Sequence, residues 1–201
     1  AMNIGVLGGT FDPVHIGHLI VAEEVMVRLG LAVVIFVPAG QPWLKADWSV
    51  TSREHRLQML HLALADKPDF QISTLEIERS GPSYTVDTMV ELREKMGSDD
   101  DLFFVLGRDN LNQLPQWQEP FRLMEMCYLV VVNRPGVPKP RLKSLEKKLP
   151  GISPRVVLLD RPEIDISASA IRERVVRGLS VRHLVPELVD RYIKENGLYI
   201  T

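Results

Sequence analysis

Apolar residues follow two periodicities along this chain, and the two alternate. Six segments are short and either continuously apolar or alternating, which is typical of strands: residues 3–7, 32–37, 70–78, 102–106, 129–132 and 155–159. Elsewhere apolar residues recur every three or four positions, which predicts helices over residues 19–29, 57–64, 86–96, 168–177 and 186–195. Thr51 and Glu54 have the spacing of a capping box ahead of the second helix. Residues 135–150 contain four prolines, which predicts a surface connection.

Strands that alternate with helices predict a parallel sheet covered on both faces. We therefore expect an α/β fold, a Rossmann-like doubly wound parallel sheet, formed by a single domain over residues 2–201. Ala1, ahead of Met2, is typical of a residue left from cloning and is excluded from that domain. Ligands of such sheets bind outside the carboxyl ends of the strands, so polar residues that follow strands are candidates for a site.

The composition is that of an ordinary globular protein. Hydrophobic residues make up 45% of the chain and charged residues 25%, which is enough apolar surface to offset the entropy of ordering. The formal net charge of -2 gives no overall attraction to nucleic acid. Cys127 is the only cysteine, and no membrane-spanning run or signal peptide is recognised, so we expect a cytoplasmic protein with no membrane or nucleic-acid partner. Its apolar surroundings favour a buried strand thiol over a catalytic one.

The strongest candidate for chemistry lies between the first predicted strand and the first predicted helix. Residues 8–18 have the sequence GGTFDPVHIGH. Adjacent glycines let the backbone approach a phosphate, and the helix start adds unpaired N–H groups. His15 and His18 could donate to the same oxygen atoms. The segment is neither a P-loop nor a G-x-G-x-x-G fingerprint, which argues against a P-loop NTPase and a dehydrogenase. A zinc site would need a third ligand, and none is obvious from the spacing.

A second polar cluster opens the helix predicted over residues 168–177. Serine at a helix start is most often a simple N-cap, and taken alone that interpretation is favoured here. Ser167 and Ser169 could also donate hydroxyl hydrogen bonds, and Arg172 could form a paired contact with phosphate. A polyphosphate held between the two clusters would be neutralised from two sides, as nucleotidyl transfer requires.

Together the two clusters resemble the HxGH nucleotidylyltransferase superfamily, through GGTFDPVHIGH at residues 8–18 and ISASAIR at residues 166–172. Within it the whole chain is similar to the bacterial nicotinate mononucleotide adenylyltransferases. The segments that carry this narrower likeness are Lys45, 83–85, 107–110, Trp117 and 133–136. The sequence departs from the family pattern in the loop 41–45 and at Arg108, which leaves the roles of Lys45 and Arg108 open.

The resemblance implies a role for each site residue. The ATP phosphates would be bound by Gly8, Gly9, Thr10, Phe11, His15, His18, Ile166, Ser167, Ser169 and Arg172. The ribose region of ATP would be contacted by Gly107 and Asp109. The mononucleotide would be bound by Lys45, Tyr84, Thr85, Trp117 and Arg134. The catalytic residues would be His18, His15 and Arg172. Mg²⁺ would accompany ATP, bound mostly by phosphate oxygens and water and not by a protein metal site. Trp117, Lys45, Asp109 and residues 83–85 also have purely structural interpretations as packing, solvated charge, helix cap and helix start.

The reaction implied is attack of the 5′-phosphate of nicotinate mononucleotide on the α-phosphorus of ATP, as a step of NAD biosynthesis. One alternative is a related nucleotidylyltransferase whose acceptor is phosphopantetheine, glycerol phosphate or nicotinamide mononucleotide. Another is a nucleotide-binding regulator that has lost catalysis. The sequence leaves open the preference for acid or amide, and whether the chain forms a homo-oligomer.

Overall fold

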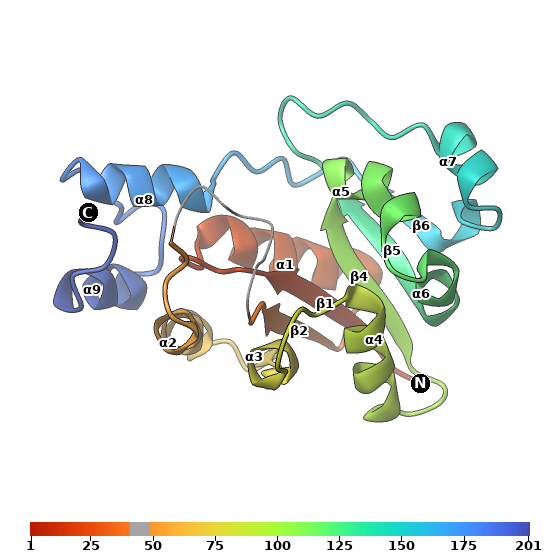
Figure 1. The fold of residues 1–201 in the computed structure, drawn as a ribbon, viewed down its shortest axis with the longest axis horizontal. Helices are drawn as coiled ribbons and strands as arrows, with labels where there is room; N and C mark the ends of the chain where they lie inside the picture. Colours follow the sequence, from red (N-terminus) through yellow and green to blue (C-terminus); the bar gives the residue numbers. More distant parts are fainter. Residues whose placement is uncertain (41–48) are drawn as a thin grey trace.

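The computed structural model describes residues 1–40 and 49–201. Within these residues it contains one six-stranded sheet in which all neighbouring strands are parallel (Figure 1). The strands are β1 (Asn3–Gly9), β2 (Val33–Pro38), β3 (Phe70–Ile72), β4 (Asp101–Gly107), β5 (Cys127–Val132) and β6 (Val156–Leu159). Their spatial order, β3-β2-β1-β4-β5-β6, is that of a doubly wound sheet. The predicted fold class is therefore confirmed.

Helices cover both faces of the sheet and create two hydrophobic cores. One core is formed with α1 (Ile16–Leu29), α2 (Arg53–Leu64), α8 (Ala168–Val176) and α9 (Glu187–Glu195). The other is formed with α4 (Thr85–Glu94), α5 (Arg108–Gln113), α6 (Pro120–Met126) and α7 (Leu142–Lys148). Strand β2 shows why both faces are apolar: Phe36 belongs to the first core, whereas its neighbours Ile35 and Val37 belong to the second.

Two predictions near β3 and α2 were wrong. The predicted strand 70–78 ends at Ile72, and α3 (Leu75–Glu78) follows, because the Ser73 side chain accepts a hydrogen bond from the Leu75 N–H at 3.4 Å and turns the chain. Ser52, and not Thr51, is the N-cap of α2, since its Oγ accepts from the His55 N–H at 3.3 Å.

Helix α7 was also missed, inside the stretch 135–150 that was predicted to be a surface connection. Leu145 in the helix and Leu149 directly after it are both buried, so this short helix covers the second core with one apolar side. The four prolines nevertheless all lie outside the helix. Two 3₁₀ turns complete the description, η1 (Leu114–Gln116) and η2 (Ser153–Arg155).

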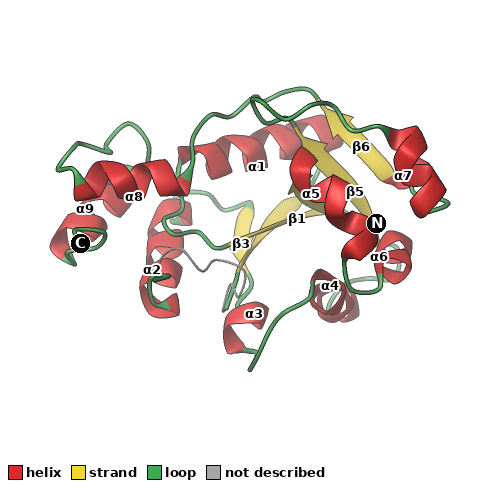
Figure 2. Cartoon of the chain, turned by 45° about the horizontal axis from the view of Figure 1, so that its top comes forward, coloured by secondary structure: helices red, strands yellow, loops and turns green. Residues whose placement is uncertain are grey.

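The order of strands reverses between β1 and β4, and this switch point positions the site. In such sheets the crevice at the carboxyl ends of the two central strands is where ligands bind. Figures 1 and 2 show the starts of α1 and α8 close together at this end of the sheet. Among the residues that the structure describes, no helix is both long and apolar enough to cross a membrane.

Candidate active site

A cavity of about 680 Å³ opens at the carboxyl ends of the central strands, a size that suits a nucleotide-sized ligand. It brings together most of the residues predicted for the site: Gly8, Gly9, Thr10, Phe11, His15, His18, Thr85, Gly107, Asp109, Trp117, Arg134, Ile166, Ser167, Ser169 and Arg172. Tyr84 is not among the lining residues and is 37% exposed. Lys45 lies outside the described residues.

His15 and His18 form a stacked pair at the start of α1. Their ring centroids are 3.6 Å apart with an interplanar angle of 24°. The backbone N–H of His15 donates to Nδ1 of His18 at 3.1 Å. Because Nδ1 accepts in this bond, the neutral ring of His18 carries its proton on Nε2, which becomes a donor.

Burial keeps both imidazoles neutral. His15 is 5% exposed, and desolvation lowers its pKa to about 4. The pKa of His18 is also well below its usual range, because of desolvation and then the neighbouring His15. Among residues 1–40 and 49–201, Nδ1 of His15 is buried without a hydrogen-bond partner. The pair can therefore donate or accept hydrogen bonds at neutral pH without adding positive charge.

The packing of Ile164 and His15 around position 17 leaves room only for glycine. A Cβ at position 17 would lie 2.8 Å from a methyl carbon of Ile164 and 2.9 Å from ring atoms of His15. Such distances are shorter than real carbon contacts, so any side chain here would displace the histidine pair. The glycine of the H-x-G-H motif thus has a steric role.

Arg56 fixes the backbone around the entrance to the cavity. The side chain is only 1% exposed, and its guanidinium donates to carbonyl oxygens of two loops and of the start of α2. These acceptors are Thr10 (3.0 Å), Ala39 (2.6 Å), Gly40 (3.0 Å) and Thr51 (2.8 Å). The guanidinium of Arg56 therefore joins the loops that follow β1 and β2. Its buried nitrogen atoms all find carbonyl acceptors, as a buried charge requires.

The first polar cluster is linked to the second through Asp12. Nη1 of Arg172 donates to the backbone carbonyl of Asp12 at 2.7 Å. Ser167 is the N-cap of α8, with its Oγ accepting from the Ala170 N–H at 3.2 Å, so the simple capping interpretation is correct for this serine. A hydroxyl that accepts can still donate its own hydrogen, so Ser167 remains available to a phosphate.

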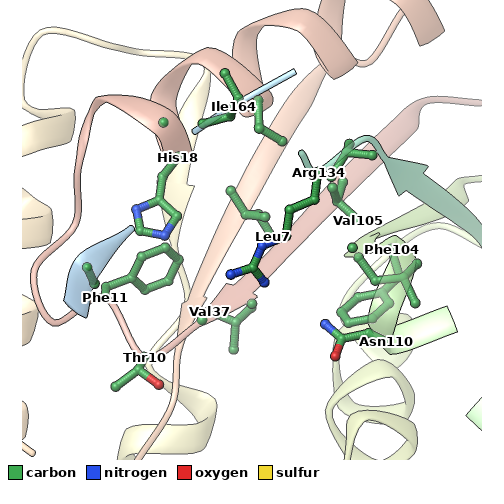
Figure 3. A pocket seen from close by; sticks show the side chains of 18 of the residues that line it. Leu7, Thr10, Phe11, His18, Val37, Phe104, Val105, Asn110, Arg134 and Ile164 are labelled. Atoms are coloured by element: carbon green, nitrogen blue, oxygen red, sulfur yellow. The ribbon is translucent and has the colours of Figure 1, made fainter. Parts of the chain in front are cut away.

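The opposite wall of the cavity is formed by residues that follow β4 and β5. Asp109 Oδ2 lies 3.4 Å from Nη1 of Arg134, which lies in the cavity between His18 and Asn110 (Figure 3). Trp117 is half-buried and makes an edge-to-face contact with Phe104, with centroids 6.3 Å apart. This wall combines an aromatic ring with exposed charges of both signs.

Arg108, whose role the sequence leaves open, is directed elsewhere. Its Nη1 donates to the Val137 carbonyl at 3.0 Å, and its Nη2 lies 3.5 Å from a carboxylate oxygen of Asp160. The residue is absent from the lining of the cavity. It connects the segments that follow β5 and β6.

Several lining residues were missed in the sequence. Asn110 and Asn133 lie within segments that carry the family likeness, so a signal for them was present. Glu76 had none, because the short helix α3 was not predicted. Thr88 lies in the helix predicted over residues 86–96, but a threonine within a helix gives no signal of a site. Thr88 Oγ1 donates to Glu76 Oε2 at 2.8 Å, and burial raises the pKa of this carboxyl group.

Comparison with known proteins agrees with this geometry. The family model described as cytidylyltransferase-like matches residues 6–174. A protein of Dehalococcoides mccartyi named as a probable nicotinate-nucleotide adenylyltransferase is 48% identical over 99% of this chain and 98% of its own length. The chain belongs to the cytidylyltransferase-like family. A Thermomicrobium roseum protein is also named as a probable nicotinate-nucleotide adenylyltransferase. It is 46% identical to this chain over 99% of this chain and 92% of its own length.

A solved structure supports the fold of this cytidylyltransferase-like protein. Plasmodium falciparum nicotinic acid mononucleotide adenylyltransferase complexed with NaAD superposes with a TM-score of 0.80, covering 99% of this chain and 98% of that one. The sequence identity is 21%, so the likeness concerns the fold.

Nucleotidyltransferases generally use a divalent metal ion, and carboxylate groups are typical ligands for such an ion. The carboxylates that line the cavity of this cytidylyltransferase-like protein are engaged with neighbouring side chains. Asp109 pairs with Arg134, and Glu76 accepts from Thr88. In the part of the chain that the structure describes, no three His, Cys, Asp or Glu side chains gather in a way that could hold a metal ion.

Proposed function

We propose that this protein transfers the adenylyl group of ATP to nicotinate mononucleotide, giving nicotinate adenine dinucleotide and pyrophosphate. The observation that carries the proposal is that His18 and Arg172, from the two ends of the chain, line one cavity. The names of relatives 46–48% identical over 99% of the chain support the choice of reaction. A cytoplasmic location is part of the proposal, and the single cysteine is compatible with it.

ATP would bind between the starts of α1 and α8. The start of α1 behind Gly8 and Gly9 offers the positive end of the helix dipole, although the Ile16 N–H already donates to the Leu184 carbonyl at 2.9 Å. The neutral His18 offers its Nε2 proton to the α-phosphate. Ser167, Ser169 and Arg172 would receive the β- and γ-phosphates, as a hydroxyl and guanidinium cluster suits a dense anionic charge. Gly107 and Asp109, at the start of α5, would bind the ribose.

Nicotinate mononucleotide would occupy the wall formed by α4, η1 and the segment after β5. The pyridine ring would stack on Trp117. Its carboxylate would meet the start of α4, where Thr85 is the first helical residue and, within the described part of the chain, the side chain of the N-cap residue Tyr84 makes no capping hydrogen bond. Arg134, with Lys45 and Tyr84, would complete the phosphate and ribose contacts. Tyr84 is exposed and would have to approach the ligand from the rim of the cavity.

In the reaction, an oxygen of the acceptor 5′-phosphate forms a bond to the α-phosphorus of ATP, and the bond from that phosphorus to the bridging oxygen of pyrophosphate breaks. The attacking oxygen is already anionic, so no general base is needed. His18 would stabilise the charge on the α-phosphate oxygens with a fixed donor, and Arg172 would stabilise the departing pyrophosphate. Mg²⁺ bound to the ATP phosphates would supply further charge neutralisation.

Pyrophosphate release with a panel of acceptors tests this function. The purified protein would be mixed with ATP and Mg²⁺ and, separately, nicotinate mononucleotide, nicotinamide mononucleotide or phosphopantetheine. The proposal expects the largest kcat/KM for nicotinate mononucleotide and formation of the acid dinucleotide in equal amount to pyrophosphate. A larger kcat/KM for either other acceptor would replace the proposed substrate. Binding of ATP without pyrophosphate release from any acceptor would indicate a regulator instead.

A further inference from the structure

Asp12 connects three distant parts of the chain at the edge of the cavity. The residue is 1% exposed, although it lines the cavity. One carboxylate oxygen accepts from the backbone N–H of Thr51 at 3.0 Å, and the other accepts from the hydroxyl of Tyr199. Its carbonyl accepts from Arg172 at 2.7 Å. The side chain of Asp12 is thus fixed from two directions, and its backbone supports the arginine of the second polar cluster.

Tyr199 reaches Asp12 from beyond α9, outside the residues 6–174 that the family model matches. Its φ of +64° is in the left-handed region, which is rare for an aromatic residue. Such a backbone conformation persists only where the surroundings require it, and it often occurs at functional sites. The hydrogen bond to Asp12 is therefore made by a residue whose backbone conformation the surrounding structure has to stabilise.

The charges around Asp12 explain why its position matters. The carboxylate favours the charged forms of both Arg56 and Arg172, opposing the lowering of each pKa by burial. The pKa of Tyr199 is raised by burial and then by the charge of Asp12, so the phenol stays a donor. A carboxylate beside a triphosphate would repel it if it turned inward, so both its oxygens need partners.

We infer that Tyr199 is a positioning residue for ATP, because it fixes Asp12 and, through the Asp12 carbonyl, the guanidinium of Arg172. This inference rests on the proposed function, in which Arg172 binds the β- and γ-phosphates. Loss of the hydroxyl would leave the cavity intact but allow Asp12 and Arg172 to shift, which would weaken the binding of ATP.

The test is Tyr199→Phe, with Tyr192→Phe as the matched control. The Tyr192 hydroxyl is 2.7 Å from Nδ1 of His55, so the control also loses one hydrogen bond of a C-terminal tyrosine, but away from the cavity. Tyr199→Phe is expected to raise KM for ATP and Kd for ATP about 5- to 20-fold, with KM for nicotinate mononucleotide unchanged. Tyr192→Phe should leave all three constants unchanged. In an Arg172→Ala background, Tyr199→Phe should add no further increase.

The outcomes separate this inference from the proposed function. Absence of pyrophosphate release by the wild type would overturn the function itself. With an active wild type, equal KM values for ATP in Tyr199→Phe and Tyr192→Phe would overturn the role of Tyr199, as would full additivity with Arg172→Ala. If Tyr199→Phe does not fold, Asp12→Ala is measured instead: it removes the acceptor of the Tyr199 hydroxyl, and an unchanged KM for ATP would contradict the inference.

Discussion

The backbone N–H of His15 donates a hydrogen bond of 3.1 Å to Nδ1 of His18. This single bond selects the tautomer of the second histidine and orients its Nε2 proton. The first histidine is therefore both part of the lining and the support of its neighbour. A spacing of three residues is what allows the backbone of one to reach the ring of the other at a helix start.

His18→Ala should lower kcat for pyrophosphate release by about 10²–10³, the usual effect of losing one preorganised donor to a developing charge. KM values should change less, because the donor acts mainly in the transition state. Steady-state kinetics with His183→Ala as control would measure this, since His183 is exposed and outside the cavity. Near-normal turnover in His18→Ala would remove His18 from the mechanism.

The stability of the fold should depend on pH through His15. Its pKa is about 4 in the folded protein and 6.5 as an ordinary value, so below pH 6.5 the unfolded chain binds a proton that the folded chain does not. The free energy of unfolding should therefore fall as pH falls from 6.5 to 4, by up to about 3 kcal/mol from this group. Urea unfolding at several pH values would measure the slope. His15→Gln should reduce the slope, and an unchanged slope would contradict the assignment.

Arg172→Ala should weaken the use of ATP by about tenfold or more in KM, because a charged donor to the phosphates is lost. Arg177→Ala is the control, since Arg177 lies at the end of the same helix and is exposed in a pair with Glu173. Kinetics with ATP as the varied substrate would distinguish them. Equal KM values for the two variants would mean that the second cluster does not bind phosphate.

Arg56→Ala should destabilise the protein by about 3 kcal/mol or more, because four partly buried carbonyl oxygens lose a donor. Arg56→Lys should recover only part of this, since an ammonium group has fewer donors in a different geometry. Arg28→Ala, which breaks an exposed pair with Glu24, should cost less than about 0.5 kcal/mol. Urea unfolding would rank the three, and a mild effect of Arg56→Ala would show that water replaces its donors.

The alternation of strands and helices could be predicted because both cores rely on regular spacing, as in β2 and α1. Cys127, expected as a buried strand thiol, is 1% exposed in β5, and burial raises its pKa to about 12. Helix α3 could not be predicted, since the alternating residues 70–78 resemble a strand until the Ser73 side chain turns the chain. The spacing of apolar residues does not reveal that a serine side chain can take up a backbone N–H group that would otherwise pair with a neighbouring strand.

The site was predictable where its residues lie in one short segment, as His15 and His18 do. The contact between Asp12 and Tyr199 joins residues 187 positions apart, and no pattern within a window of sequence contains both. Arg56 was hidden for a different reason: an arginine on a helix is normally read as a solvent-facing charge, and only the tertiary structure shows its carbonyl partners.

A neutral imidazole pair has a consequence for the conditions under which the cavity attracts its ligand. With both rings uncharged, the positive field that faces a triphosphate comes from guanidinium groups and helix starts, none of which titrates near neutrality. Mild acidification should then leave the charge of the protein side of the cavity unchanged, so that any change in nucleotide affinity comes from protonation of the ligand's own phosphates, whereas added salt should reduce affinity through screening. The protein's own contribution to nucleotide binding should therefore depend on ionic strength more than on pH.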